Sequence, residues 1–179
     1  MKKTSVGIIL LTEIQSMGGL VAILQIRGEF NHEKKGPESW PGGCQISAHG
    51  KVEDPNHSPW HLAQEMYREV GEELGDDFKE AIIHDPLCRI QLLVHKDDEK
   101  EEVFTYGARI SADQLGMVRL NASTGGLRLM NKEKLDAIMN LRDFDKEVGI
   151  RDRTITAMFP DEIEAVKKAF EAFAPQTAP

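Results

Sequence analysis

Three glutamates gather within five positions of one predicted helix. Glu69, Glu72 and Glu73 stand at i, i+3 and i+4, which places them on one helical face, and Glu65 lies one turn earlier on the same side. Like charges at this spacing repel by roughly 0.2–0.5 kcal/mol per pair. Mg²⁺ and Ca²⁺ prefer oxygen ligands, so a cation would turn the repulsion into coordination. The spacing therefore points to a divalent-cation site, with an ordinary solvated face as the alternative.

The residues around the cluster favour the cation site. Arg68 sits beside the glutamates, where it could order one carboxylate. Gly71 costs the helix about 1 kcal/mol relative to alanine, and Gly75 is a natural residue to end it. Upstream, the glycine-bearing turn HGKVE (49–53) leads into the same helix. A plain solvated face would need none of these features.

Together these residues resemble the box of the Nudix hydrolase family. That box runs Gly, five residues, Glu, seven residues, then Arg-Glu-apolar-any-Glu-Glu-any-Gly. Residues 68–75, REVGEELG, match its second half without a gap, and GKVE (50–53) with the preceding WPGG (40–43) resembles its opening turn. The spacing between the two halves is four residues longer than the pattern, and Asn56 stands where the family has its first glutamate. The extra length equals about one helical turn, which would extend the helix without rotating its glutamates.

The resemblance implies a metal-dependent hydrolase. Glu69, Glu72 and Glu73, with the backbone carbonyl of Gly50, would hold Mg²⁺ or Mn²⁺ ions, and the catalytic residues would be Glu72, Glu73 and Arg68, with Arg68 orienting a glutamate. The ions would neutralise a diphosphate and activate a water to attack phosphorus. The implied substrate is a nucleoside diphosphate linked to another moiety and cleaved within the pyrophosphate.

Residues outside the helix are candidates for substrate binding. Arg27, at the end of a predicted strand, could reach a phosphate, and Glu53 belongs to the turn before the helix. Trp40 and Phe30 flank the loop before the box and could stack on a base, with burial of Trp40 in the core as the alternative.

The general base is open between a box glutamate and an acid from a distant loop. Glu101, Glu102 and Glu133 are the candidates outside the box, and an ordinary surface position is the alternative for each.

Other chemistries have weaker support. A non-hydrolytic Nudix-like nucleotide-binding module is suggested by the insertion and the missing first glutamate. An isomerase resembling the isopentenyl diphosphate isomerases would use Cys44 as a nucleophile, although WPGGCQISAHG lacks that family's cysteine–histidine pattern. His57 and His61 stand at i, i+4, a spacing that zinc ligands use, but no HExxH pattern is present.

The elements that must position these residues can be read from hydrophobic patterning. SVGIILL (5–11) and LVAILQIR (20–27) predict a hairpin through Gly18-Gly19, and 28–43 a polar loop. Residues 44–53 predict one or two short strands, 54–56 a turn, and 87–95 with 102–110 a second hairpin.

Three helices complete the prediction. The first has Ser58 as N-cap, Pro59 at its first position and an apolar stripe at Leu62, Met66, Val70 and Leu74. Residues 131–141 and 160–173 predict the others, the last burying Ile163, Val166, Phe170 and Phe173. Hairpin strands with interspersed helices predict an α+β or α/β/α sandwich, a mixed sheet flanked by helices.

Bulk properties set the remaining expectations. At 179 residues the chain fits a single domain, 1–179, with a C-terminal helical extension at about 142–175. A net charge of −8 argues against nucleic acid as the main partner. The chain has no apolar run of membrane-spanning length, and two cysteines are too few for a disulfide framework, so a cytoplasmic protein without a membrane partner is expected. The family resemblance implies a small nucleotide-type substrate. A homodimer is the commonest oligomer of such proteins.

Overall fold

The computed structural model describes residues 2–32, 34–53 and 58–174. The turn predicted at 54–56, which includes Asn56, lies outside the described residues. The same holds for His57, one of the two histidines considered as zinc ligands. None of the described helices is both long and apolar enough to cross a lipid bilayer.

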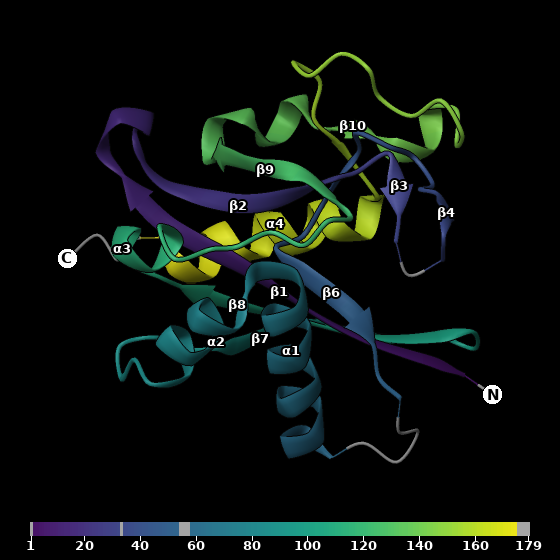
Figure 1. The fold of residues 1–179 in the computed structure, drawn as a ribbon. Coiled ribbons are helices and arrows are strands. Elements are labelled where there is room, and N and C mark those ends of the chain that lie inside the picture. Colours follow the sequence, from purple (N-terminus) through teal and green to yellow (C-terminus); the bar gives the residue numbers. More distant parts are fainter. Residues whose placement is uncertain (1, 33, 54–57, 175–179) are drawn as a thin grey trace.

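The centre of the molecule is a mixed sheet, to which seven strands contribute within the described residues (Figure 1). β1 (Lys3–Ile14) and β2 (Gly19–Arg27) form the predicted antiparallel hairpin. β1 also runs parallel to β8 (Glu101–Arg109), which pairs with β7 (Gln91–Asp97). The short strands β5 (Cys44–Gln45) and β6 (Ala48–Lys51) pair with β2 and β1, and β9 (Thr124–Asn131) pairs with β2.

Side chains of the hairpin alternate between two hydrophobic cores. Val6, Ile8 and Leu10 of β1 face helices α1 (Pro59–Leu74) and α2 (Asp76–Ile83). Ile9 and Leu11 face the opposite side, where α4 (Pro160–Phe173) packs. Because both faces of the sheet are covered, its strands read as continuous apolar runs rather than alternating ones. The predicted sandwich of a mixed sheet between helices is confirmed.

Helix α1 begins and ends where the sequence predicts. The Ser58 hydroxyl accepts a hydrogen bond from the His61 backbone N–H at 3.2 Å, and the apolar stripe Leu62, Met66, Val70 and Leu74 is buried. At the other end, Gly75 has φ of +101°, a conformation that favours glycine. The helix packs on β6, so the glutamate cluster is held beside Gly50, which lies in that strand rather than in the predicted turn.

Several elements differ from the prediction. The helix predicted at 131–141 is wrong: β9 extends to Asn131, a 3₁₀ turn covers Lys132–Ala137, and β10 (Met139–Asn140) follows. In the described part of the predicted C-terminal extension, 142–174, only α4 is α-helical. The chain between α4 and the 3₁₀ turn Leu141–Asp143 contains β11 (Ala157–Met158), which pairs with β10. Strand β7 begins at Gln91 rather than at residue 87.

The structure also contains elements that the prediction lacks. These are α2, β9, the one-turn helix α3 (Ala112–Leu115), and the small hairpin of β3 (Phe30–Asn31) and β4 (Gly36–Pro37) inside the predicted polar loop. The new strand β9 and the small hairpin lie next to the end of β2, where they build the walls of the candidate site.

Candidate functional site

The predicted box residues line one cavity of about 720 Å³, here called the carboxylate cavity. Gly50, Arg68, Glu69, Glu72 and Glu73 all contribute to its wall. Two of the predicted substrate-binding residues, Arg27 and Glu53, line it as well. The fold therefore brings together residues from β2, from β6 and the residues that follow it, and from α1.

Gly50 lies directly against the Glu69 carboxylate. A Cβ atom added at Gly50 would stand 1.8 Å from the Glu69 Oε1 and Cδ atoms, so only glycine fits there. Glu69 is 8% exposed, which is unusual for a carboxylate. This contact explains the glycine of the box: the backbone of β6 packs onto the Glu69 carboxylate.

Arg68 holds three carboxylates at once. Its Nη1 atom donates to both oxygens of Glu72 at 2.9 Å, while Nε and Nη2 donate to Glu65 Oε2 at 3.2 and 3.0 Å. Nη2 also donates to Glu69 and, at 3.2 Å, to the Lys51 carbonyl. Although burial disfavours its charge, hydrogen bonds to Glu72 and Glu65 raise the pKa of Arg68. Arg68 thus offsets the repulsion within the cluster and ties α1 to the turn.

Glu73 is held from the sheet side. Its Oε2 atom accepts hydrogen bonds from Gln25 Nε2 and from the His49 backbone N–H, both at 3.0 Å. Gln25 is itself 2% exposed, and it also donates to the Ser47 carbonyl at 2.6 Å and accepts from the Thr124 hydroxyl at 3.1 Å. A buried amide with three partners fixes the direction of the Glu73 side chain.

The donor set suits a hard divalent cation. Carboxylates and a backbone carbonyl are the ligands that Mg²⁺ and Mn²⁺ take, and Glu69 is buried at the site with Gly50 against it. Within the described ranges, Glu69, Glu72 and Glu73 do not form a set of three with ligand atoms all within 4.8 Å of one another. Arg68 bridges two of them instead, so a cation that took several carboxylates would compete with Arg68 for their oxygens.

Trp40 takes a different place from the one predicted. Its ring packs edge-on against Phe159 with centroids 5.2 Å apart, in a small hydrophobic cluster with Leu141 and Ile150. Its indole N–H donates to the Phe144 carbonyl at 3.3 Å. Trp40 is not among the residues that line the carboxylate cavity, and the alternative of burial describes it better. Phe30 is 45% exposed in β3 and contacts His32.

The acids proposed as a distant base lie away from the cavity wall. Glu101 pairs with Lys96 at 2.6 Å, and Glu102 contacts His95 at 2.9 Å, both within the β7–β8 hairpin. Glu133 lies in the 3₁₀ turn after β9. None of the three lines the carboxylate cavity.

The nucleophile and zinc alternatives gain no support. Cys44 is fully buried in the α4-side core, and burial raises the pKa of its thiol to about 11, so the thiolate needed for attack is disfavoured. His61 contacts Glu65 at 3.6 Å on α1.

Sequence reasoning missed several residues of the cavity. Asn31, Lys34 and Glu38 come from the small hairpin segment, and Asn121, Ser123 and Thr124 from the segment that leads into β9. Neither segment carries a recognisable motif. Gln25 was detectable, because a glutamine inside the apolar run LVAILQIR needs buried hydrogen-bond partners.

No family model matches the chain, and no curated protein matches it. Solved structures do match. The NUDIX domain of Shewanella oneidensis NrtR, complexed with ADP ribose, has a TM-score of 0.58 at 15% identity over 97% of this chain and 90% of that one. A mutT/nudix family protein from Listeria innocua has a TM-score of 0.58 at 19% identity over 95% and 92%. A binary complex of C. elegans Ap4A hydrolase has a TM-score of 0.51 at 14% identity over 96% of both chains. At these identities the likeness concerns the fold, and the Nudix fold implied by the sequence is confirmed.

Proposed function

We propose that the protein is a hydrolase that uses Mg²⁺ or Mn²⁺ to cleave the pyrophosphate of a nucleoside diphosphate linked to another moiety. The observation that carries the proposal is the packing of Gly50 against Glu69 at the wall of a cavity that Glu72 and Glu73 also line. A buried carboxylate, two further carboxylates and a cavity of about 720 Å³ suit a metal–diphosphate complex. The structural neighbours described with ADP ribose and as an Ap4A hydrolase support a nucleotide-type substrate.

Each residue has a defined task in this proposal. Glu69, Glu72 and Glu73 would hold the cation, with the Gly50 carbonyl as a further ligand. A bound cation supplies charge neutralisation for the diphosphate and lowers the pKa of a bound water. Glu72, with 52% of its side chain exposed, is the carboxylate assigned to take the proton of the attacking water. Arg68 orients the glutamates and Gln25 orients Glu73.

Two cations of the cavity lining would receive the phosphates. Arg27 and Lys34 line the carboxylate cavity together with the glutamates and supply positive charge there. The Arg27 guanidinium also contacts Glu38 at 3.5 Å, which restrains its side chain. These cations would orient the diphosphate relative to the carboxylate wall.

The test is hydrolysis of a panel of diphosphate-linked nucleotides by the wild-type protein with Mg²⁺, with Mn²⁺, and with EDTA. We expect turnover of at least one substrate with either cation and none with EDTA. Glu72→Gln should lower kcat by at least 100-fold, because it removes both a ligand charge and the base. Glu171→Gln, which changes an exposed glutamate on α4, is the matched control and should keep full activity. Absence of turnover for the whole panel would refute the proposal.

A second function is favoured by the hydrogen bonds of Arg68. Because Arg68 occupies oxygens of Glu69 and Glu72, the site is also consistent with a module that binds a nucleotide without cleaving it. Tight binding of a nucleotide without hydrolysis, unchanged in Glu72→Gln, would identify that module.

A further inference from the structure

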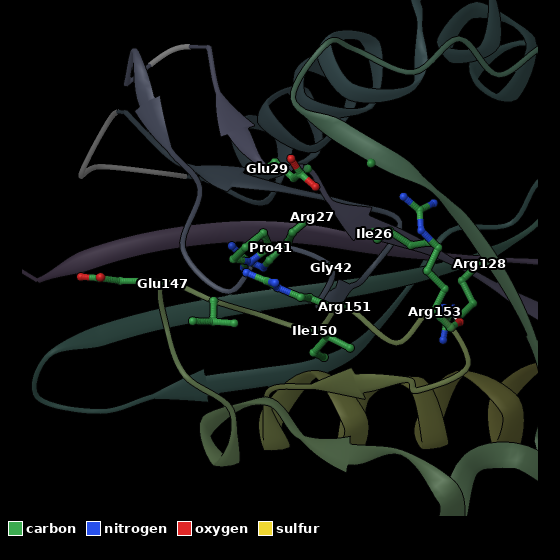
Figure 2. Close-up of a pocket in the computed structure, with 13 residues that line it drawn as sticks. Ile26, Arg27, Glu29, Pro41, Gly42, Arg128, Glu147, Ile150, Arg151 and Arg153 are labelled. Atoms are coloured by element: carbon green, nitrogen blue, oxygen red, sulfur yellow. Dashed lines mark hydrogen bonds between the residues drawn. The ribbon is translucent and has the colours of Figure 1, made fainter.

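A second cavity of about 710 Å³, here called the arginine cavity, adjoins the first (Figure 2). Ile26 and Arg27, at the end of β2, line both cavities. The other walls of the arginine cavity come from Pro41 and Gly42, from β9, and from residues 147–153. The two cavities are therefore neighbours that share the lining residues Ile26 and Arg27.

The walls of the arginine cavity are held by backbone contacts. The Ile150 N–H donates to the Pro41 carbonyl at 2.7 Å, and the Gly42 N–H donates to the Arg27 carbonyl at 2.9 Å. Gly149 has φ of +64°, and a Cβ there would lie 2.0 Å from the Pro41 oxygen. This close approach means that the WPGG segment and residues 147–153 form one fixed unit.

Arg128 of β9 forms hydrogen bonds with residues 153–156, which follow directly on this segment. Its Nη1 atom donates to the Thr156 hydroxyl at 2.7 Å and to the Ile155 carbonyl, and its Nη2 atom donates to the Arg153 carbonyl. All of these acceptors are neutral, so they fix the guanidinium without cancelling its charge.

The arginine cavity is positively charged in an acidic molecule. Arg27, Arg128, Arg151 and Arg153 line it against Glu29 and Glu147, whereas the chain carries −8. In the view of Figure 2, Arg27 and Arg151 lie at the centre, with Arg128 and Arg153 at the right. Across the described ranges, no residue forms an ion pair or hydrogen bond with the guanidinium of Arg151 or Arg153.

Arg27 carries a further donor at the wall that the cavities share. Its Nε atom is buried and has no hydrogen-bond partner among the residues described. A buried donor without a partner destabilises the folded state, and an anionic ligand that accepts from it would remove that penalty. Guanidinium groups bind phosphate through paired N–H donors. The chemistry on this wall is that of a phosphate-binding site.

We propose that the arginine cavity binds a second phosphate of the substrate, a phosphate monoester on the moiety remote from the diphosphate at the carboxylate cavity. The statement that this phosphate belongs to a substrate rests on the proposed function. The phosphate site itself depends only on Arg27, Arg151 and Arg153.

Binding without metal tests the site directly. In EDTA no cation can bring a phosphate to the glutamates of the carboxylate cavity, so a difference in inorganic pyrophosphate binding between wild type and an arginine variant, measured by calorimetric titration, reports on the arginine cavity. We expect Arg151→Gln/Arg153→Gln to weaken pyrophosphate binding at least tenfold. Arg89→Gln, which changes an exposed arginine before β7, should leave the affinity within twofold of wild type. No binding by the wild type, or equal binding by the double variant, would overturn the proposal.

Steady-state kinetics separates this inference from the proposed function. Substrates are used in pairs that differ by one phosphate monoester, such as NADP⁺ and NAD⁺, with Mg²⁺ present. The double variant should raise KM at least tenfold for the phosphorylated member of a hydrolysed pair and leave kcat and the other KM unchanged. Hydrolysis with unchanged KM for every pair would refute the second phosphate site alone. Pyrophosphate binding that depends on the arginines, without hydrolysis of any pair, would refute the proposed function alone.

Discussion

At the scale of single residues, the site depends on contacts that no similar side chain can reproduce. Arg68 reaches Glu65, Glu69 and Glu72 together because its planar fork presents several donors. Gln25 links Glu73 to Ser47 and Thr124, and so couples the helix to the sheet. These two side chains set the positions of the carboxylates.

Gly50 supplies the sharpest residue-scale prediction. In Gly50→Ala the new Cβ would collide with the Glu69 carboxylate at 1.8 Å, so the glutamate or the turn must move. We expect at least a tenfold loss of hydrolysis and of Mn²⁺ affinity, with a stability loss of about 1–3 kcal/mol from overpacking. Kinetics, manganese titration and urea unfolding measure the three effects.

Gly36→Ala is the matched control for this change. The nearest atom to a Cβ at Gly36 is 3.8 Å away, so alanine fits without a shift. Full activity in Gly50→Ala would show that the position of Glu69 does not matter for the reaction.

At the scale of elements, Gly71 lies where two helices meet. A Cβ at Gly71 would stand 2.8 Å from Asp76 Oδ1 and 3.2 Å from Lys79 Cδ, both on α2. The glycine inside the glutamate cluster therefore lies where α2 crosses α1, and it serves the packing of two helices rather than the metal ligands.

Gly71→Ala should nevertheless be slightly stabilising. Alanine gains about 1 kcal/mol of helix propensity, and the atoms it meets belong to side chains that can move. We expect the free energy of unfolding to rise by less than about 1 kcal/mol in urea denaturation, with unchanged kcat. A loss of stability would mean that the Asp76–Lys79 pair is too rigid to yield.

The sequence predicts those elements that carry their own local signals. The first hairpin and α1 have continuous apolar runs, a Ser-Pro start and a glycine end, and they fold as expected. β9 has two glycines in TGGLRLMN and gains its strand conformation from pairing with β2, which is distant in sequence. The same pairing includes Asn131, the first residue of the helix predicted at 131–141, and the residues that follow form a 3₁₀ turn instead.

The same distinction applies to the site. The carboxylates and Gly50 could be predicted because they lie in one motif with fixed spacing. The partners that hold Glu73 and the arginines of the second cavity come from β2, β9 and a loop near residue 150, and only the folded chain brings them together. Trp40 carries a stacking side chain, but the Phe144–Phe159 segment that covers it could not be located from sequence.

At the scale of the whole molecule, α4 covers one face of the sheet and carries Glu162 in its first turn. The Glu162 carboxylate accepts from the Ile46 and Phe159 N–H groups, both at 3.4 Å. Burial raises its pKa to about 7, helped by Asp161 and opposed by Arg27 and these hydrogen bonds. The folded protein therefore binds a proton more tightly at this site than the unfolded chain does.

The stability of the protein should depend on this proton. Because the pKa of Glu162 is higher in the folded protein than in the unfolded chain, its protonation stabilises the fold. This contribution is fully present below the unfolded pKa of 4.5 and is lost as the pH rises through the folded pKa of about 7. Between about pH 5 and 8, wild type should lose about 1–3 kcal/mol more stability than Glu162→Gln, whose side chain cannot ionise. Urea unfolding at both pH values measures this difference. An equal change in the free energy of unfolding for the two proteins would contradict the raised pKa of Glu162.

The account depends most on the claim that the carboxylates of α1 take up a divalent cation. Calorimetric titration of the wild-type protein with Mn²⁺ tests it directly, beside Glu73→Gln and the control Glu171→Gln. We predict saturable binding by wild type and by the control, weakened at least tenfold in Glu73→Gln. Absence of Mn²⁺ binding by the wild type, with and without a nucleotide, or equal binding by all three proteins, would contradict the account.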